Sequence, residues 1–145
     1  MAINGAEKIR RINYLISEVE AWYHRAALKL GVSDSVSVVL YTIWETGDGC
    51  PLQDIYKKSG ISKQTVNSAI RTLEEKGILY LEQCAGRAKK VLLTEQGKQY
   101  IKETAARLYE AELQAFSAWT EDEINTYISL IEKYAICLQT QIERL

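Results

Sequence analysis

Residues 61–77 read ISKQTVNSAIRTLEEKG, and they predict a helix with two distinct faces, around which the rest of the chain can be ordered. Ser62 can cap the start of this helix, and Gly77 can end it by adopting the left-handed conformation. Apolar residues recur at helical spacing along one face: Val66, Ala69, Ile70 and Leu73. The opposite face carries amides, hydroxyls and cations: Lys63, Gln64, Asn67, Ser68 and Arg71.

The polar face differs from an ordinary solvated surface, which is mostly Glu and Lys. Amide, hydroxyl and guanidinium groups match the hydrogen-bonding edges of bases and phosphates. The acids Glu74 and Glu75 stand only in the last turn, where they oppose the helix dipole and would approach DNA poorly. The N-terminal half of the helix is therefore the part expected to face DNA.

The charge of the chain is asymmetric although its net charge is only −1. Between Lys57 and Lys98 there are nine basic and four acidic residues, and the remainder holds nine basic and fifteen acidic ones. A basic middle between acidic ends is the pattern of a DNA-contacting segment flanked by helices with another role.

Helical patterns precede this segment. Apolar residues at steps of three and four predict a long helix over about 7–30, which Gly31 ends. Ser33 or Asp34 can cap a second helix, which directs Val36, Val39, Leu40, Ile43 and Trp44 toward a core. The GDGCP run at 47–51 predicts a turn. A short helix over about 52–59 then buries Leu52, Ile55 and Tyr56, so a helix-turn-helix is predicted.

Extended patterns follow Gly77. ILYLEQC and VLL predict a β-hairpin whose tip, AGRAKK, holds Arg87, Lys89 and Lys90 without an acid. A cationic hairpin after a helix-turn-helix is the arrangement called a winged helix.

The C-terminal part is predicted to be helical. Thr94 opens one long helix that reaches Phe116, and Thr120 with Glu123 forms a capping box for a final helix. The apolar stripe of this last helix, from Ile124 to Ile142, is longer than a small winged helix could cover. We expect the two chain ends to pack together and against a second copy.

On these motifs the chain resembles the MarR family of transcriptional regulators over nearly its whole length. The most family-like parts are residues 61–79, the basic wing, and the run Leu93-Thr94-Glu95-Gln96-Gly97. The resemblance implies a mostly α fold with a small β-hairpin, a winged helix-turn-helix over 33–98, and helical dimerisation regions over 1–32 and 99–145. It also implies a homodimer on a pseudo-palindromic operator, usually a repressor, which a small molecule often releases.

Residues matching the family pattern are the candidate sites. The expected DNA contacts are Ser62, Lys63, Gln64, Thr65, Asn67, Ser68, Arg71, Arg87, Lys89 and Lys90. The expected lining of a pocket for a small aromatic effector is Trp22, Tyr23, His24, Tyr41, Trp44 and Tyr109.

Other function classes remain as alternatives. A winged-helix module that binds protein would show an apolar or acidic presenting face, and Gln64, Asn67 and Arg71 argue against it. An enzyme is disfavoured because His24, the only histidine, stands in a Trp-Tyr-His run and is expected to be packed or interfacial.

The remaining composition is typical of a cytoplasmic protein without cofactor or metal. Cys50, Cys84 and Cys137 show no paired spacing, so neither a disulfide framework nor a zinc site is expected, and Cys84 is predicted to be a buried strand thiol. The chain has no apolar run of membrane-spanning length and no signal-peptide pattern at its start.

Overall fold

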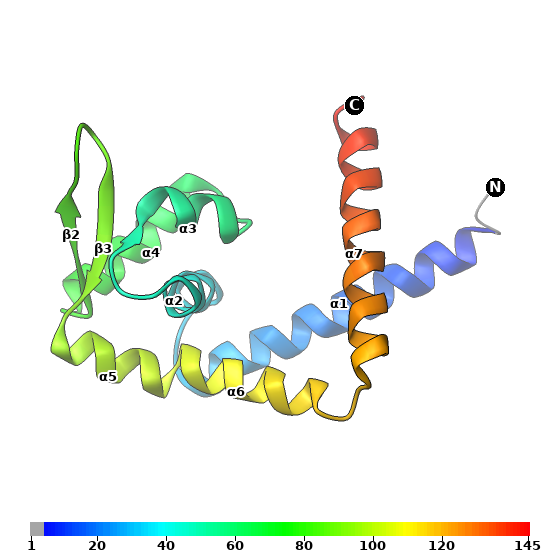
Figure 1. The fold of residues 1–145 in the computed structure, drawn as a ribbon, viewed down its shortest axis with the longest axis horizontal. Coiled ribbons are helices and arrows are strands. Elements are labelled where there is room, and N and C mark those ends of the chain that lie inside the picture. Colours follow the sequence, from blue (N-terminus) through cyan, green and yellow to red (C-terminus); the bar gives the residue numbers. More distant parts are fainter. Residues whose placement is uncertain (1–4) are drawn as a thin grey trace. The chain divides into compact units, whose positions relative to one another are not determined.

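The computed structural model describes residues 5–145, so the first four residues of the predicted region 1–32 lie outside the described part. Helices and three short strands follow one another along these residues (Figure 1). The elements are α1 (Gly5–Leu30), α2 (Asp34–Thr46), β1 (Cys50–Pro51), α3 (Leu52–Lys58), α4 (Lys63–Glu75), β2 (Leu79–Gln83), β3 (Lys89–Leu93), α5 (Glu95–Glu103), α6 (Ala105–Phe116) and α7 (Glu121–Ile142). They divide into two compact units, one ending at Tyr109 and one spanning Glu110–Leu145.

The core of the first unit forms between α2, α3, α4 and the sheet. Its fully buried side chains include Leu40, Ile55, Leu73 and Val91, one from each of these elements. The predicted inward residues of α2 are buried except Trp44, which is 37% exposed, so that part of the prediction is wrong. Ser33 caps α2 by accepting a hydrogen bond from the Val36 amide at 3.2 Å.

The start of α4 follows the sequence-based expectation. Ser62 Oγ accepts a hydrogen bond from the Thr65 amide at 3.1 Å, which satisfies one unpaired donor of the first turn. Val66, Ala69, Ile70 and Leu73 are all buried, as predicted.

The end of α4 is closed by two hydrogen bonds beyond the helix. The Gly77 amide donates to the Glu74 carbonyl at 2.9 Å, and the Ile78 amide donates to the Leu73 carbonyl at 2.9 Å. This pair of bonds is a Schellman motif, which requires the positive φ of +72° that Gly77 adopts. The same motif buries Ile78 against the core and starts the chain on its way into β2.

The sheet has three strands in the order β1-β3-β2, all antiparallel. The register of the predicted hairpin pairs Leu81 with Val91 and Gln83 with Lys89. The third strand, β1, was missed because it is only two residues long and lies within the run that predicts a turn. Pro51 fits there because β1 is an edge strand, where a missing N–H costs no ladder bond.

The long helix predicted from Thr94 to Phe116 is wrong, because the structure has two helices, α5 and α6, separated at Thr104. Thr104 has φ −121° and ψ −90°, and its amide donates to the Ile101 carbonyl at 3.4 Å. Its hydroxyl donates instead to the Tyr100 carbonyl at 2.8 Å, which is the acceptor that a continuous α-helix would assign to the Thr104 amide. The backbone therefore leaves helical geometry at Thr104, and the first helix ends there.

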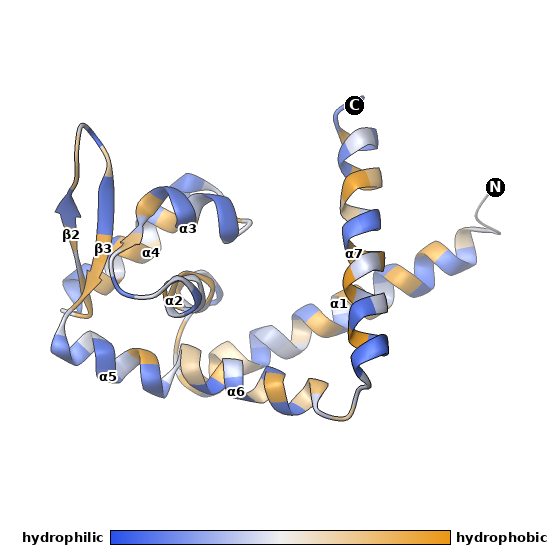
Figure 2. Cartoon of the chain, viewed as in Figure 1, coloured by the Kyte–Doolittle hydropathy of each residue, from blue (hydrophilic) through white to orange (hydrophobic). Residues whose placement is uncertain are grey.

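The second unit consists of the end of α6, a turn and α7. The predicted capping box is confirmed: Thr120 Oγ1 accepts from the Glu123 amide at 3.1 Å, and Glu123 Oε1 accepts from the Thr120 amide at 3.0 Å. Phe116, Trp119 and Tyr127 pack ring against ring at centroid distances of 5.0 to 6.4 Å. Apolar residues recur along α7 between polar ones, and none of its residues is buried (Figure 2).

The predicted fold class, mostly α with a small β-hairpin, is confirmed, and β1 extends the hairpin to a three-stranded antiparallel sheet. Across residues 5–145 no single helix is long and apolar enough to cross a membrane. α1 and α2 would reach that length and apolarity only when taken together, and they are bent by 89° with respect to each other.

Candidate nucleic-acid interface

The exposed face of α4 is built from the predicted residues. Ser62, Lys63, Gln64, Thr65, Asn67, Ser68 and Arg71 are all exposed, and the first turn of the helix contains no acid. Their positions follow from the burial of Val66, Ala69, Ile70 and Leu73, because a helix that buries one stripe must turn the other stripe outward. The N-terminal end of α4 also carries the positive end of the helix dipole. The face is therefore suited to an anionic partner with hydrogen-bonding edges.

Two side chains of this face are held by Tyr56 of α3. The Tyr56 hydroxyl donates to Asn67 Oδ1 at 2.6 Å, and Lys63 Nζ lies 5.0 Å from the centroid of the Tyr56 ring. The sequence predicted Tyr56 as a buried core residue, but the side chain is half-buried and its polar tip reaches the surface. The signal that could have identified it is the residue type, since a tyrosine on a core face usually directs its hydroxyl to a partner.

The wing is formed by β2, β3 and the loop 84–88 between them. Gly86 turns this loop with φ +68°, and Gln83 Nε2 donates to the Gly86 carbonyl at 3.0 Å. Arg87 lies in the loop and is exposed. Lys89 and Lys90 were predicted in the tip, which is wrong, because both belong to β3.

The three wing cations are not equivalent. Lys90 lies opposite Glu82 in the strand register, and its Nζ is 3.6 Å from Glu82 Oε1. Arg87 and Lys89 are exposed and take part in no ion pair among residues 5–145. The uncompensated positive charge of the wing therefore resides on Arg87 and Lys89.

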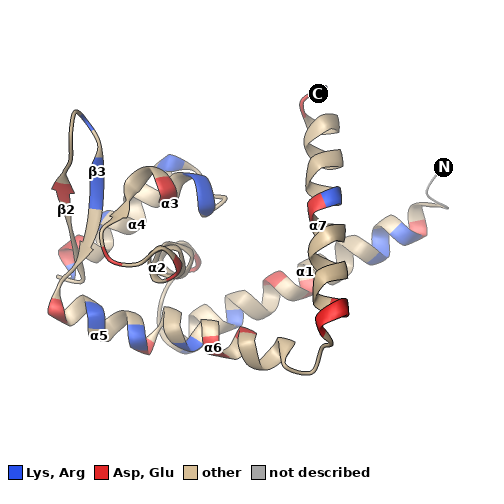
Figure 3. Ribbon diagram, in the orientation of Figure 1, with Lys and Arg blue, Asp and Glu red and all other residues tan. Residues whose placement is uncertain are grey.

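Additional cations lie on α3. Lys57 and Lys58 occupy its last turn, are both exposed, and precede the polar face of α4 by a few residues. Figure 3 shows lysine or arginine on both α3 and β3. The sequence analysis counted these lysines in the basic segment without assigning them to the site.

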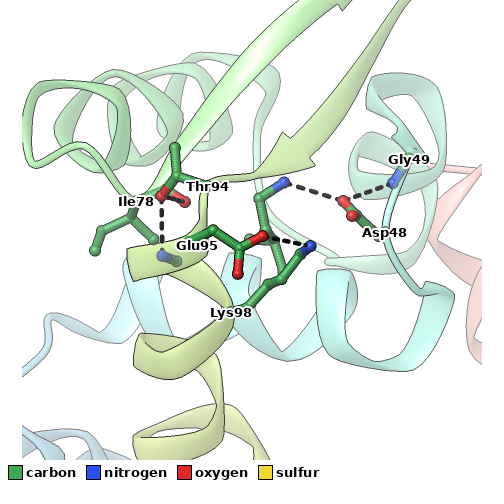
Figure 4. Close-up of polar contacts among 8 residues, drawn as sticks. Asp48, Gly49, Ile78, Thr94, Glu95 and Lys98 are labelled. Carbon is green, nitrogen blue, oxygen red and sulfur yellow. Dashed lines mark hydrogen bonds and ion pairs between the residues drawn. The ribbon is translucent and has the colours of Figure 1, made fainter.

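A hydrogen-bonded junction attaches the wing to the end of α4 (Figure 4). Thr94 Oγ1 donates to the Gly77 carbonyl at 2.6 Å and accepts from the Gly97 amide at 2.9 Å. Asp48 Oδ1 accepts from the Leu93 amide at 3.0 Å, and from the Gly49 amide at 3.1 Å. Beside them, Lys98 Nζ donates to Glu95 Oε1 at 3.0 Å, and this hydrogen bond raises the pKa of Lys98. The junction links the orientation of the wing to the end of α4.

The residues predicted to line an effector pocket are distributed over three helices. Trp22, Tyr23 and His24 lie on the exposed surface of α1, and the guanidinium of Arg25 lies 4.5 Å from the Trp22 ring centroid. Trp44 of α2 and Tyr109 of α6 face each other at a centroid distance of 6.2 Å. The remaining member, Tyr41, is half-buried against the core. Among the predicted lining residues, Trp44 and Tyr109 therefore contact each other.

His24 links α1 to α2. Its Nδ1 lies 2.8 Å from both carboxylate oxygens of Asp34, and its side chain is 57% exposed. The expectation of a histidine packed within the chain is therefore wrong, and the alternative of an interfacial histidine stays a prediction. The contact is an exposed ion pair when the imidazole is protonated.

The three cysteines are free and differ in environment. Cys50 is buried, and burial raises the pKa of its thiol. Cys84 is exposed just beyond the end of β2, so the prediction of a buried strand thiol is wrong, because β2 ends at Gln83 and the chain turns into the loop there. Over the described residues 5–145, no group of three or more His, Cys, Asp or Glu side chains could hold a metal ion.

Comparison with known proteins supports the resemblance to the MarR family. A model of the MarR family matches residues 33–89. The uncharacterised helix-turn-helix transcriptional regulator YwaE of Bacillus subtilis (strain 168) is 31% identical over 104 residues, which is 70% of this chain and 60% of that protein. The match thus spans less than two thirds of that relative.

Solved structures share the fold at low sequence identity. A MarR family regulator from Neisseria meningitidis has a TM-score of 0.79 at 20% identity, covering 94% of this chain and 97% of that one. The structure of MepR from S. aureus in complex with DNA has a TM-score of 0.66 at 20% identity, covering 94% and 99%. The likeness at this identity shows a shared winged-helix fold.

Proposed function

We propose that this chain, which belongs to the MarR family of transcriptional regulators, binds double-stranded DNA by placing the start of α4 in the major groove. The observation that carries the proposal is the exposed face of α4, which offers amides, hydroxyls and cations but no acid in its first turn. An α-helix fits the major groove of B-DNA, and in helix-turn-helix proteins the N-terminal residues of the second helix contact base edges. The MepR–DNA complex is consistent with this use of the fold.

The two DNA-facing elements differ in the readout that each can provide. Gln64 and Asn67 are uncharged and can distinguish bases through hydrogen bonds. Arg87 and Lys89 are uncompensated cations on the wing, which suit phosphates or the minor groove and bind with little sequence preference. Lys90 contributes less, because Glu82 already neutralises part of its charge.

The functional unit is a homodimer. No residue of α7 is buried, and its exposed apolar side chains include Tyr127, Ile128 and Ile131 at 43% to 48% exposure. α1 similarly buries only Ala27 among its 26 residues. Apolar stripes of this length are characteristic of association surfaces, and a symmetric pair would present two α4 helices to a pseudo-palindromic operator with half-sites about 34 Å apart.

The proposed regulatory action is repression of transcription. Binding of a small aromatic molecule to the protein relieves this repression. Trp22, Trp44 and Tyr109 supply exposed aromatic surface on helices outside the DNA-facing side chains. Such a ligand must favour a dimer geometry in which the two α4 helices no longer match successive major grooves. A panel of aromatic acids and phenols that changes neither DNA affinity nor the melting temperature would exclude this step while leaving DNA binding in place.

Two other classes fit the surface less well. A protein-binding winged helix would need an apolar or acidic α4 face, and the exposed face here is neither. A catalytic role for His24 finds little support in its position on the exposed surface of α1, where its side chain is 57% exposed.

The test is fluorescence anisotropy on a duplex selected from a random library and on random DNA, at several salt concentrations. Gln64→Ala should cost about 1–3 kcal/mol on the selected duplex and much less on random DNA. The Arg87→Ala, Lys89→Ala double variant should weaken all sequences alike. It should also lower the slope of log affinity against log salt by roughly 3 to 4, since each lost phosphate contact removes about 0.9 and a dimer has two wings.

Lys29→Ala is the matched control, because it removes an exposed cation of α1 at a distance in sequence from both elements. Its salt slope should equal that of the wild type. If the wing variant keeps its slope while Gln64→Ala loses affinity uniformly, the roles of α4 and the wing are reversed. If the wild type binds no duplex at low salt, DNA binding itself is wrong.

A further inference from the structure

The contact between Tyr56 and the polar face of α4 determines which hydrogen-bonding groups that face can offer. Tyr56 lies on α3, and its ring packs against the core while its hydroxyl reaches the surface. The hydroxyl donates to Asn67 Oδ1 at 2.6 Å, a short bond for two neutral groups. Lys63, one helical turn before Asn67, places its ammonium over the Tyr56 ring. We call Tyr56, Lys63 and Asn67 the Tyr56 cluster.

The hydrogen bond orients the Asn67 amide. The amide group is planar, with its oxygen and nitrogen on opposite branches, so an oxygen held toward α3 leaves the nitrogen pointing away from α3. The Asn67 nitrogen makes no hydrogen bond within residues 5–145, and the side chain is exposed. Asn67 therefore presents its N–H donors outward and keeps its acceptor on the protein side.

Lys63 adds a second donor to the same surface. An ammonium group has three N–H donors and no acceptor, and its contact with the Tyr56 ring restricts where it lies. Together, Lys63 and Asn67 present donors at the start of α4, while the Asn67 oxygen is directed toward Tyr56.

A donor-only surface distinguishes the purines in the major groove. Guanine presents two acceptors there, N7 and O6, whereas adenine presents the N7 acceptor beside the N6 donor. An asparagine that is free to rotate pairs with adenine in a bidentate way, which needs both its oxygen and its nitrogen on the DNA side. The oriented Asn67 cannot do so while its oxygen is bound to Tyr56.

We propose that Tyr56 is a positioning residue that holds Asn67 as a hydrogen-bond donor, so that the base pair facing Asn67 and Lys63 is selected as guanine over adenine. The proposal rests on the proposed function, because it assigns a base preference to the DNA complex of α4. Tyr56 itself needs no contact with DNA in this role.

The experiment begins with selection of binding sites from a random duplex library by the wild-type protein. All single-base variants of the selected duplex are then titrated by fluorescence anisotropy. Asn67→Ala identifies the base pair read by Asn67, as the position at which the preference relaxes. The wild type should prefer guanine at that position.

Tyr56→Phe is the decisive variant, because it removes the hydroxyl and keeps the ring that packs on the core and under Lys63. The guanine-to-adenine affinity ratio at the assigned position should fall by about tenfold, equivalent to about 1.4 kcal/mol. Affinity for random DNA and the salt slope should stay unchanged, since no charge is removed. Tyr100→Phe is the matched control: Tyr100 is also half-buried against the core but lies on α5, and the ratio should not change.

A double-mutant cycle separates positioning from a structural effect. In the Asn67→Ala background, Tyr56→Phe should no longer change the base ratio. Asn67→Asp provides a second readout that leaves Tyr56 intact, because the carboxylate can accept from the hydroxyl but has no N–H to donate. This variant should lose the guanine preference while keeping the wild-type melting temperature within a few degrees.

The possible outcomes test sequence-specific binding and the positioning role of Tyr56 separately. If the wild type enriches no sequence, sequence-specific binding fails and the base assignment fails with it. If the wild type enriches a site but the position read by Asn67 is adenine, or Tyr56→Phe leaves the ratio unchanged, only the role of Tyr56 is overturned. A uniform loss of affinity on all sequences in Tyr56→Phe would also overturn it, since that result indicates a general contact or a structural defect.

Discussion

Replacing Gly97 with alanine should break the junction between α4 and the wing. Gly97 lies in the first turn of α5, and a Cβ added to it would lie 1.8 Å from the Ile78 carbonyl oxygen and 2.8 Å from its carbon. Because real Cβ contacts essentially never fall below 3.0 Å, that oxygen would have to move by at least about 1.2 Å. The obstacle is backbone, so no side-chain rotation can relieve it.

The magnitude follows from the bonds that this movement breaks. The Ile78 carbonyl accepts from the Thr94 amide at 3.1 Å and from Thr94 Oγ1 at 3.1 Å, and each such bond contributes about 0.5–1.5 kcal/mol. Thr94 also caps α5 through the Gly97 amide, which contributes about 1 kcal/mol. Against this loss, alanine gains nearly 1 kcal/mol of helix propensity over glycine. The net destabilisation should be about 1–3 kcal/mol.

The assay is urea and thermal unfolding at matched protein concentration, because dimer formation makes stability concentration-dependent. Gly97→Ala should lower the melting temperature by roughly 2 to 12 °C. Lys102→Ala, an exposed substitution on the same helix, should change it little. An unchanged or raised melting temperature for Gly97→Ala would show that helix propensity outweighs the steric contact and would refute the reasoning.

Three further outcomes are expected. Truncation after Trp119 should yield aggregated or unfolded protein in sedimentation and circular dichroism, because the dimer surface on α7 is lost, and a soluble, folded monomer would contradict this. Backbone hydrogen bonding at Thr120 lowers the pKa of Glu123, so its contribution to stability is present above the ordinary pKa of 4.5 and is lost as the pH falls toward the lowered folded-state value. The stability difference between wild type and Glu123→Gln should therefore shrink in acid, and a difference that is constant from pH 7 to pH 3 would argue against the effect. An aromatic disulfide reagent should modify Cys84 rapidly and buried Cys50 only on unfolding, as followed by mass spectrometry of digested protein; equal rates in the native state would contradict the assigned environments.

Much of the fold could be predicted because its signals are local in the chain. The two faces of α4, the cap at Ser62 and the capping box at Thr120 depend on residues within one or two helical turns, so spacing and residue type suffice. The exposed members of the α4 face followed from the same periodicity. The identity of the DNA-facing candidates therefore required no knowledge of distant contacts.

The wing and the helix predicted over residues 94–116 were predicted less well. The position of Lys89 and Lys90 depends on where β3 begins, which is set by the pairing of Gln83 with Lys89 across the hairpin. The strand β1 exists only because β3 is available to pair with it. The break at Thr104 is not resolved by residue patterns, because Thr42 and Thr72 make the same hydroxyl bond to the carbonyl four residues earlier without ending their helices.

The sequence by itself determined the caps at Ser62 and Thr120, the buried stripe of α4 and the polar residues opposite to it, because each depends on neighbours a few residues away. Only the tertiary structure decided that Lys90 is compensated by Glu82, that Cys84 is exposed, and that the Tyr56 hydroxyl orients Asn67. Those properties depend on groups from different elements meeting in space, at distances that spacing along the chain does not specify.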